Sequence, residues 1–221
     1  MGMLATGHCS HLLPLIAAGM DTKEHIGACE PRGDTHMYDD MIQLFKAAGV
    51  NVVPTISYLE LAVRLSGNNE ALNSDDELAP FMPERDSFGW MFELKGDERK
   101  PWLSWYKNSV EEAGKLSKAG INLGTGTDIW QVPIGVHWEL EQLVHAGISP
   151  LEAIHIGTGR SARIIGAEKD FGTIEVGKWA DLVLLDADPL ADIRNTRRIW
   201  QVFKYGQQID RPAILKIMKP K

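Results

Sequence analysis

The chain has 221 residues, of which 44% are hydrophobic and 24% are charged, and its formal net charge is −7. This balance is typical of a globular protein of one or two domains, and the acidic charge argues against nucleic acid as a partner. No apolar run approaches the roughly 18 residues of a membrane span, and no basic residue leads an apolar N-terminal segment. Two cysteines form no disulfide framework, so we expect a cytoplasmic protein.

The first 60 residues alternate short apolar strands with helical segments. Strands are predicted at residues 3–8, 21–27 and 50–57, and the third of these is the richest in β-branched residues. Helices are predicted between them, at residues 12–18 and 37–48, and a glycine follows each. Strands that alternate with helices over short connections are typical of a parallel sheet.

Residues 59–100 interrupt this alternation with turn-forming and charged residues, which predicts a long insertion after the third strand. A helix is predicted at residues 102–119, and a fourth strand at residues 121–128, INLGTGTD. Two further helices follow. The second begins with a capping box, in which Ser149 is the N-cap, Pro150 the first helical residue and Glu152 the third.

The chain changes character after residue 166. Residues 171–211 are rich in β-forming residues and turn glycines, without a helical segment that could join parallel strands. This pattern predicts strands of a small antiparallel unit, followed by a peripheral basic tail. We therefore divide the chain into residues 1–166 and residues 167–221. Because a complete (β/α)8 barrel needs about 250 residues, the strand–helix units of the first part amount to half a barrel.

Three polar side chains each end a predicted parallel strand: His8, His25 and Asp128. The carboxyl ends of parallel strands hold the active sites of such folds, and two imidazoles with one carboxylate suit zinc or iron. A histidine at a strand end can equally be an ordinary polar residue. A phosphate site at GTGTD is disfavoured, because the lysine of a P-loop and the third glycine of a dinucleotide fingerprint are missing.

Several segments resemble the C-terminal half of the amidohydrolase superfamily. They are, in chain order, LLPLIAAGMDTKEHI, GTGTD, VHWELEQLVHAGISPLEAIHIGTGRSARIIG and GTIEVGKWADLVLLD. The likeness is greatest to the branch of imidazolonepropionase-like and Xaa-Pro or Xaa-Lys dipeptidase-like proteins. It implies an α/β fold, a partial TIM (β/α)8 barrel formed of strands five to eight, followed by strands of a small β-sandwich.

The resemblance also implies roles for the strand-end residues. His8 and His25 match the metal ligands of the fifth and sixth strands, and Asp128 matches the aspartate of the eighth. In the family this aspartate contacts the metal, takes a proton from a metal-activated water and passes it to the leaving nitrogen. One or two divalent ions are implied, zinc before iron, manganese or nickel. The family's HxH pair and its bridging lysine or glutamate belong to the first and fourth strands, ahead of the segments matched here.

Three further residues are candidates for substrate binding. His137 begins the helix after Asp128, where the family's loop faces the substrate, although a place on the helix surface is equally compatible with its position. Trp90 and Trp102 belong to the aromatic-rich region after the seventh strand of the family and could form an apolar lid. Packing of these aromatic residues against the barrel or a partner chain is the alternative.

Two functions follow as hypotheses. The first is a metal-dependent hydrolase of a C–N bond in an amide, a dipeptide or a cyclic amide of the imidazolone type, so that a small molecule or dipeptide is the substrate. The second is a non-catalytic fragment or half-barrel. Such a chain needs a partner, either another copy in a homo-oligomer or a complementing N-terminal half, to cover the open edges of its sheet.

Overall fold

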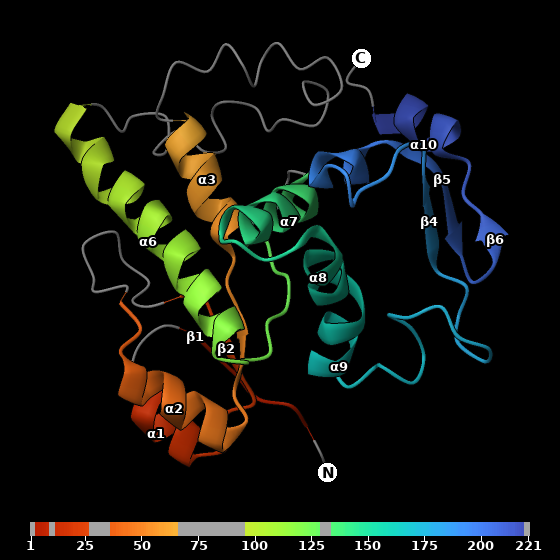
Figure 1. The fold of residues 1–221 in the computed structure, drawn as a ribbon. Helices are drawn as coiled ribbons and strands as arrows, with labels where there is room; N and C mark the ends of the chain where they lie inside the picture. Colours follow the sequence, from red (N-terminus) through yellow and green to blue (C-terminus); the bar gives the residue numbers. More distant parts are fainter. Residues whose placement is uncertain (1–2, 9–11, 27–35, 66–95, 129–133, 219–221) are drawn as a thin grey trace.

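The computed structural model describes residues 3–8, 12–26, 36–65, 96–128 and 134–218 (Figure 1). Trp90 and most of the predicted insertion lie outside the described residues. The first half of the chain forms a parallel sheet of three strands in the order β1–β2–β3. The strands are β1 (Thr6–His8), β2 (Thr22–Glu24) and β3 (Asn51–Val53), connected through α1 (Leu12–Ala17) and α2 (Asp39–Ala48).

The predicted fourth strand is reduced to a single parallel bridge between Val52 and Leu123. Val52 donates its N–H to the carbonyl of Asn122 (3.0 Å) and accepts from Gly124 (2.9 Å). The glycines beyond this bridge weaken strand character but allow close packing, because a Cβ on Gly126 would lie 2.5 Å from a methyl group of Val53. The sequence therefore predicted the position and direction of this segment correctly, but not its length as a strand.

The third strand is shorter than predicted, and a helix includes the first residues of the predicted insertion. β3 ends at Val53, and helix α3 (Ile56–Leu65) begins three residues later. Pro54 has no N–H to donate to a strand neighbour, and Thr55 has a left-handed backbone with φ 53°. These two residues end the strand, so the prediction that it extends to residue 57 was wrong, and residues 59–65 are helical.

The described residues between 96 and 164 are mostly helical. After the short 3₁₀ turn Gly96–Glu98, helix α6 (Arg99–Lys118) runs along α3 (Figure 1). Helices α7 (Gly135–His145) and α8 (Pro150–His155) follow, and a π-helical turn, Ile156–Arg160, joins α8 to α9 (Ser161–Ile164). The predicted cap of α8 is confirmed, since the Ser149 hydroxyl accepts the N–H of Glu152 at 3.3 Å. Side chains buried between sheet and helices form the core, among them Phe45, Val52, Leu116, Leu123, Leu143 and Ile156.

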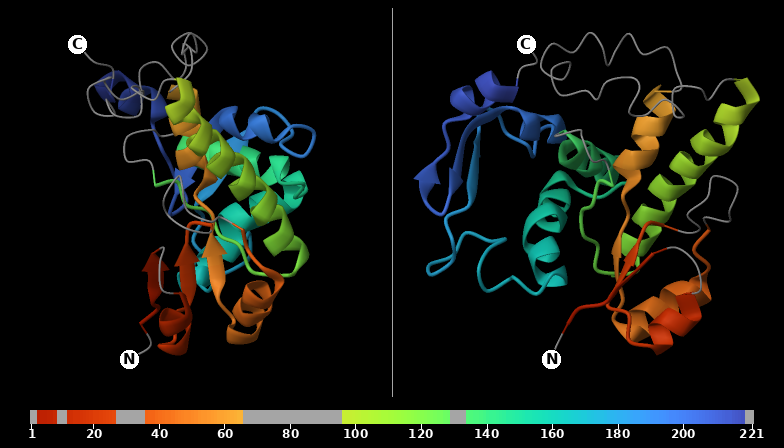
Figure 2. Two further views of the ribbon diagram at one scale, coloured as in Figure 1. Left: turned by 90° about the vertical axis from the view of Figure 1, so that its left-hand side faces the viewer. Right: turned by 180° about the vertical axis from the view of Figure 1, so that it is seen from behind.

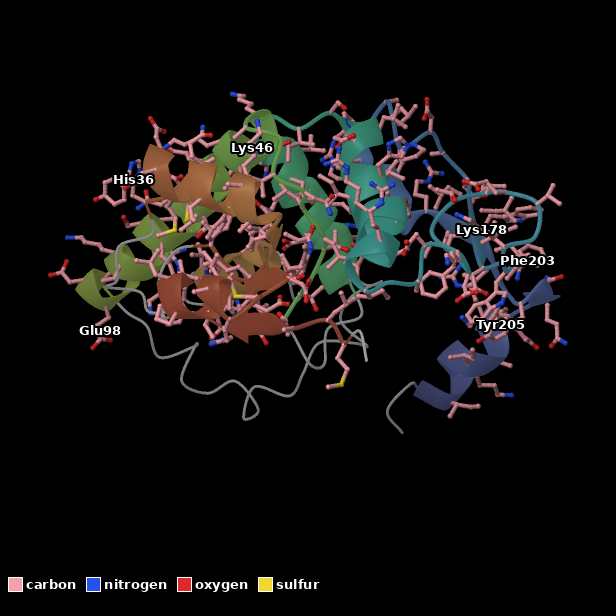
Figure 3. All side chains as sticks on the ribbon, turned by 90° about the horizontal axis from the view of Figure 1, so that it is seen from below. His36, Lys46, Glu98, Lys178, Phe203 and Tyr205 are labelled. Carbon is pink, nitrogen blue, oxygen red and sulfur yellow. The ribbon has the colours of Figure 1, made fainter. Side chains whose placement is uncertain are left out.

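The C-terminal unit is an antiparallel sheet, as predicted. It consists of β4 (Leu182–Leu185), β5 (Ile199–Lys204) and β6 (Gln207–Gln208), with a 3₁₀ turn, Ile193–Arg197, before β5 and helix α10 (Arg211–Met218) after β6. It lies beyond α8 and α9 from α1 and α2 (Figure 2). Figure 3 shows Lys178, Phe203 and Tyr205 together in this unit, at the opposite end of the molecule from His36.

Among the helices of the described part of the chain, none is both long enough and apolar enough to cross a membrane.

Candidate active site

A cavity of about 190 Å³ lies where the parallel strands end. His8 ends β1, His25 follows β2, and Asp128 ends the segment beside β3. All three line this cavity. The opposite wall comes from α3 and α6, which contribute Tyr58, Leu59, Trp102 and Trp105. The structure thus brings together the three strand-end residues singled out from the sequence, and it places Trp102 with them.

Left-handed backbone turns aim the strand ends at the cavity. His25, Thr55 and Asp128 have φ values of 62°, 53° and 48°. Positive φ is uncommon for residues other than glycine and is most costly for a β-branched one such as Thr55. In the part of the chain that the structure describes, Tyr205 is the only other non-glycine residue with positive φ. Backbone strain is therefore concentrated at this cavity, as is usual for functional sites.

A hydrogen-bond chain fixes the tautomer of His25. The Thr55 hydroxyl donates its one proton to the carbonyl of Pro54 at 2.8 Å, so the bond between Thr55 Oγ1 and His25 Nδ1 must use the N–H of the imidazole. The other ring nitrogen, Nε2, then carries the lone pair and lies 3.8 Å from Asp128 Oδ2. Burial lowers the pKa of His25 to about 4, and this effect outweighs the opposing charge of Asp128. His25 is therefore a neutral imidazole in the form that binds metals.

His8 and Asp128 complete the polar wall. The rings of His8 and His25 meet edge to face, with centroids 4.7 Å apart, while the Asp128 side chain is 45% exposed. Within the described residues, no three His, Cys, Asp or Glu side chains lie close enough together to hold one ion. The donor chemistry, two imidazoles and one carboxylate in one cavity, nevertheless fits a divalent metal such as zinc. Ligation of one ion by all three requires rotation of the exposed side chains.

Lys23 supports the turn at His25, and the sequence analysis missed it. Its side chain is fully buried, and its ammonium group donates to the carbonyls of Glu24 (3.1 Å) and His25 (2.8 Å). Burial lowers the pKa of Lys23 to about 8. A lysine in the middle of a predicted parallel strand was the available signal, because such strands are usually buried on both faces and a buried lysine is rare without a specific role.

Glu139 of α7 is a second residue that the sequence analysis missed. Its side chain is fully buried, and Oε2 accepts the N–H of Ser57 at 2.7 Å, in the first turn of α3. A carboxylate at a helix N-terminus is favoured by the helix dipole, but burial dominates and raises the pKa of Glu139 from 4.5 to about 7. Glu139 thereby anchors the helix that begins directly after Thr55. It was missed because nothing local in the sequence relates residue 139 to residue 57.

His137 is placed away from the cavity. The Thr196 hydroxyl donates its one proton to the carbonyl of Ile193 (2.8 Å). In its bond with His137 (3.0 Å) Thr196 Oγ1 must therefore accept, and His137 donates from Nδ1. Burial, with the nearby charge of Arg197, lowers the pKa of His137 to about 4. This histidine joins α7 to the C-terminal unit and does not line the cavity.

Comparison with known proteins gives a consistent assignment. The model of the amidohydrolase family matches residues 1–209. A solved structure of a Xaa-Pro dipeptidase is 25% identical with a TM-score of 0.67, and the match covers 94% of this chain and 45% of that one. A protein from Bifidobacterium longum assigned as a prolidase is 27% identical with a TM-score of 0.69, covering 98% of this chain and 50% of that one.

A curated relative adds a short local match. The 5'-deoxyadenosine deaminase of Methanobrevibacter smithii is 49% identical over 37 residues, which are 17% of this chain and 8% of the deaminase. The chain spans about half the length of the solved structures it matches. The fold of these neighbours is a TIM-barrel-type α/β fold, which agrees with the parallel sheet and its helices. With the family model matched over almost all of its length, the chain belongs to the amidohydrolase family.

Proposed function

We propose that this chain forms strands five to eight of a barrel hydrolase that cleaves a C–N bond. The observation that carries the proposal is the cavity shared by His8, His25 and Asp128 at the carboxyl ends of neighbouring parallel strands. The hydrogen bond from His25 to Thr55, which leaves Nε2 with its lone pair, supports the same assignment. Membership of the amidohydrolase family agrees with this chemistry, and its members generally use a divalent metal.

Three side chains of this chain would hold the ion: His8 and His25 through imidazole nitrogens and Asp128 through a carboxylate oxygen. When bound, a divalent ion supplies Lewis-acid activation of water near neutral pH. Zinc is the ion we expect, because imidazole and carboxylate donors suit it, and iron, manganese and nickel are accommodated by the same donors. Whether one or two ions bind depends on ligands from the remainder of the barrel.

Asp128 is the proton carrier in this proposal. Its half-exposed carboxylate faces the cavity beside His25 Nε2, where it can accept a proton from the attacking water. It then returns that proton to the leaving nitrogen, so that one carboxylate serves first as base and then as acid. His25, held neutral by burial and by Thr55, does not compete for this proton.

The names of the matched proteins support a proposal for the substrate class. Their names, a Xaa-Pro dipeptidase, a prolidase and a deaminase, favour a small molecule or a dipeptide with a hydrolysable C–N bond. Cyclic amides of the imidazolone type belong to the same chemistry.

The test combines metal analysis with two variants and a control. In the His25→Ala variant, bound zinc measured by elemental analysis should fall by most of its amount while circular dichroism stays unchanged. The Asp128→Asn variant should retain more metal than His25→Ala but hydrolyse none of a panel of Xaa-Pro dipeptides. His155→Ala, which removes an exposed histidine of α8, is the matched control. Unchanged metal content in His25→Ala would contradict the proposed site.

A second candidate is that the chain is inactive until a partner completes the site. This is favoured by the observation that the described donors do not converge within ligating distance of one ion. The partner would be a complementing N-terminal half or a further copy of the chain. Native mass spectrometry with elemental analysis distinguishes the two candidate functions. A single oligomeric state with about one metal ion per chain supports the hydrolase, and a metal-free mixture of states supports the inactive chain.

A further inference from the structure

The π-helical turn between α8 and α9 lies close to the segment that carries Asp128. In this turn, Ile156–Arg160, the N–H of Ser161 bonds to the carbonyl of Ile156, five residues earlier. Such turns are rare, and they occur frequently at functional sites. Residues 121–128 run between β3 and the helices α8 and α9 (Figures 1 and 2). The contacts between the turn and these residues therefore bear on the candidate active site.

The Ser161 hydroxyl contacts this segment directly. It donates its one proton to the carbonyl of Ile156 at 2.7 Å. Its oxygen must therefore accept in its other two bonds, from the N–H of Thr125 at 3.0 Å and from the Thr125 hydroxyl at 3.3 Å. Because the Ile156 carbonyl already accepts the N–H of Ser161, it does not need the hydroxyl as a second donor. The bond to Ile156 instead turns the lone pairs of the hydroxyl toward Thr125.

Thr125 is the first residue of the segment beyond the sheet. The last bond to β3 is the one that Gly124 donates to the carbonyl of Val52 at 2.9 Å. On the β3 side the next donor of a parallel ladder would be Pro54, which has no N–H. Ser161 thus holds the backbone at the point where the bonds to β3 end, and Asp128 follows three residues later.

Glycines allow the turn and the segment to approach each other closely. A Cβ on Gly124 would lie 2.8 Å from the side chain of Ile164 and 3.4 Å from Ser161 Oγ. A Cβ on Gly157, within the turn, would lie 3.6 Å from the methyl group of Thr125. The segment therefore packs against this helix on both sides of its hydrogen bond to Ser161.

We propose that Ser161 is a positioning residue for Asp128. By holding Thr125, its hydroxyl fixes the direction in which the chain leaves the sheet, and with it the place of the Asp128 carboxylate 3.8 Å from His25 Nε2. The proposal rests on the proposed function for one point, namely that Asp128 is a metal ligand and proton carrier. Without the Ser161 hydroxyl, the residues before Asp128 sample more conformations, so that its carboxylate occupies the ligating position less often.

The first experiment needs neither metal nor activity. It compares the native chain with Ser161→Ala by NMR, through the amide exchange rate of Thr125 and the amide and Cβ shifts of Asp128. Exchange at Thr125 should be about 10-fold faster in the variant, as the loss of one hydrogen bond predicts, and the Asp128 signals should move. Ser161→Cys, which keeps the size of the side chain but accepts hydrogen bonds weakly, should show the same changes.

Thr158→Ala is the matched control for these variants. The Thr158 hydroxyl belongs to the same turn and donates to the carbonyl of Ile154 at 2.7 Å, but it is exposed. Its removal should leave the signals of Thr125 and Asp128 unchanged. Asp128 signals that do not move in either Ser161 variant, or that move equally in Thr158→Ala, would overturn the proposal.

The second experiment distinguishes positioning of Asp128 from a general effect on the fold. Zinc affinity is measured by competition with a chelator for the native chain, Ser161→Ala, Asp128→Ala and the double variant. Ser161→Ala should bind zinc about 10-fold more weakly than the native chain. In the Asp128→Ala background the same change should have no further effect, because both changes act on one ligand. An equal loss in the two backgrounds would contradict the positioning role.

The outcome is separable from that of the proposed function. A chain that binds no zinc but shows the NMR changes would retain the hold of Ser161 on the Asp128 segment and refute the metal site. A chain that binds zinc and hydrolyses dipeptides, but in which Ser161 and Asp128 act independently, would retain the proposed function and refute the positioning role.

Discussion

Replacing Glu139 with glutamine should remove a loss of stability that the native chain undergoes as the pH rises through neutrality. Burial raises the pKa of Glu139 from 4.5 to about 7 in the folded chain, so folding favours the protonated carboxyl group. Below pH 4.5 both states are protonated and this group contributes no pH dependence. Between the two pKa values only the unfolded state releases the proton, and the free energy of unfolding falls as the pH rises.

The magnitude follows from the two pKa values. Their separation, from 4.5 to about 7, corresponds to about 3 kcal/mol at about 1.4 kcal/mol for each pH unit. This free energy is not reduced by solvent screening, because the Glu139 side chain is fully buried. The loss is complete above pH 7 and absent below pH 4.5. Glutamine keeps the acceptor oxygen for the N–H of Ser57 but cannot ionise, so the variant should lack this slope.

The assay is urea unfolding followed by tryptophan fluorescence at pH 5, 6, 7 and 8. Between pH 5 and pH 8, the difference in the free energy of unfolding between Glu139→Gln and the native chain should shift by about 2.5 kcal/mol in favour of the variant, because part of the loss has already occurred at pH 5. Glu111→Gln, on the exposed side of α6, is the control and should follow the native chain. Parallel pH profiles for Glu139→Gln and the native chain would refute the reasoning.

Three further predictions concern the site and its packing. Thr55→Val removes the acceptor for His25 Nδ1 and should weaken zinc binding about 10- to 100-fold in a competition titration with a chelator. Ser109→Ala removes a buried hydroxyl without a partner and should raise the free energy of unfolding by about 1 kcal/mol in urea. Gly126→Ala places a Cβ 2.5 Å from a methyl group of Val53 and should lower the free energy of unfolding by about 1–3 kcal/mol.

Each of these predictions has its own control. Thr55→Ser retains the hydroxyl and should bind zinc like the native chain, so equal loss in both Thr55 variants would contradict the role of the hydrogen bond. Ser104→Ala should leave stability unchanged, and a destabilised Ser109→Ala would show that its hydroxyl has a partner after all. A Gly126→Ala chain with a native urea midpoint would show that Val53 can move aside without cost.

Where the signal was local, the sequence predicted which side chains lie together in the cavity. His25 and Asp128 were identified because each ends a predicted strand in an alternation of strands and helices. The spacing of the apolar residues predicts that alternation. The cap at Ser149 was predicted because a capping box involves only neighbouring residues. The division between parallel and antiparallel sheets followed from the presence or absence of helices between strands.

The residues that the sequence did not predict depend on contacts between distant segments. Thr55 was read as part of a strand, because a left-handed turn at a β-branched residue is disfavoured by its own chemistry. Only the bond to His25, 30 positions earlier in the chain, shows its role. Glu139 is a charged residue in a fully buried position, and its partner, Ser57, is 82 positions away in the chain. Lys23 donates to the carbonyls of its neighbours Glu24 and His25, but its burial depends on packing that the local sequence does not show. His137 was a candidate from its place after Asp128, but its contact with Thr196 is tertiary.

Helix α7 is shared between the two parts of the chain, and its rotation about its own axis is thereby fixed. His137 and Glu141, four residues apart, lie on one face and bind Thr196 and Arg197 of the C-terminal unit. Glu139, between them in sequence, lies on the other side and binds the start of α3. One inserted or deleted residue within α7 would turn the following residues by about 100° and break one set of contacts or the other. Differences in length among relatives should therefore fall in the connections on either side of α7, and the helix itself should keep a constant length.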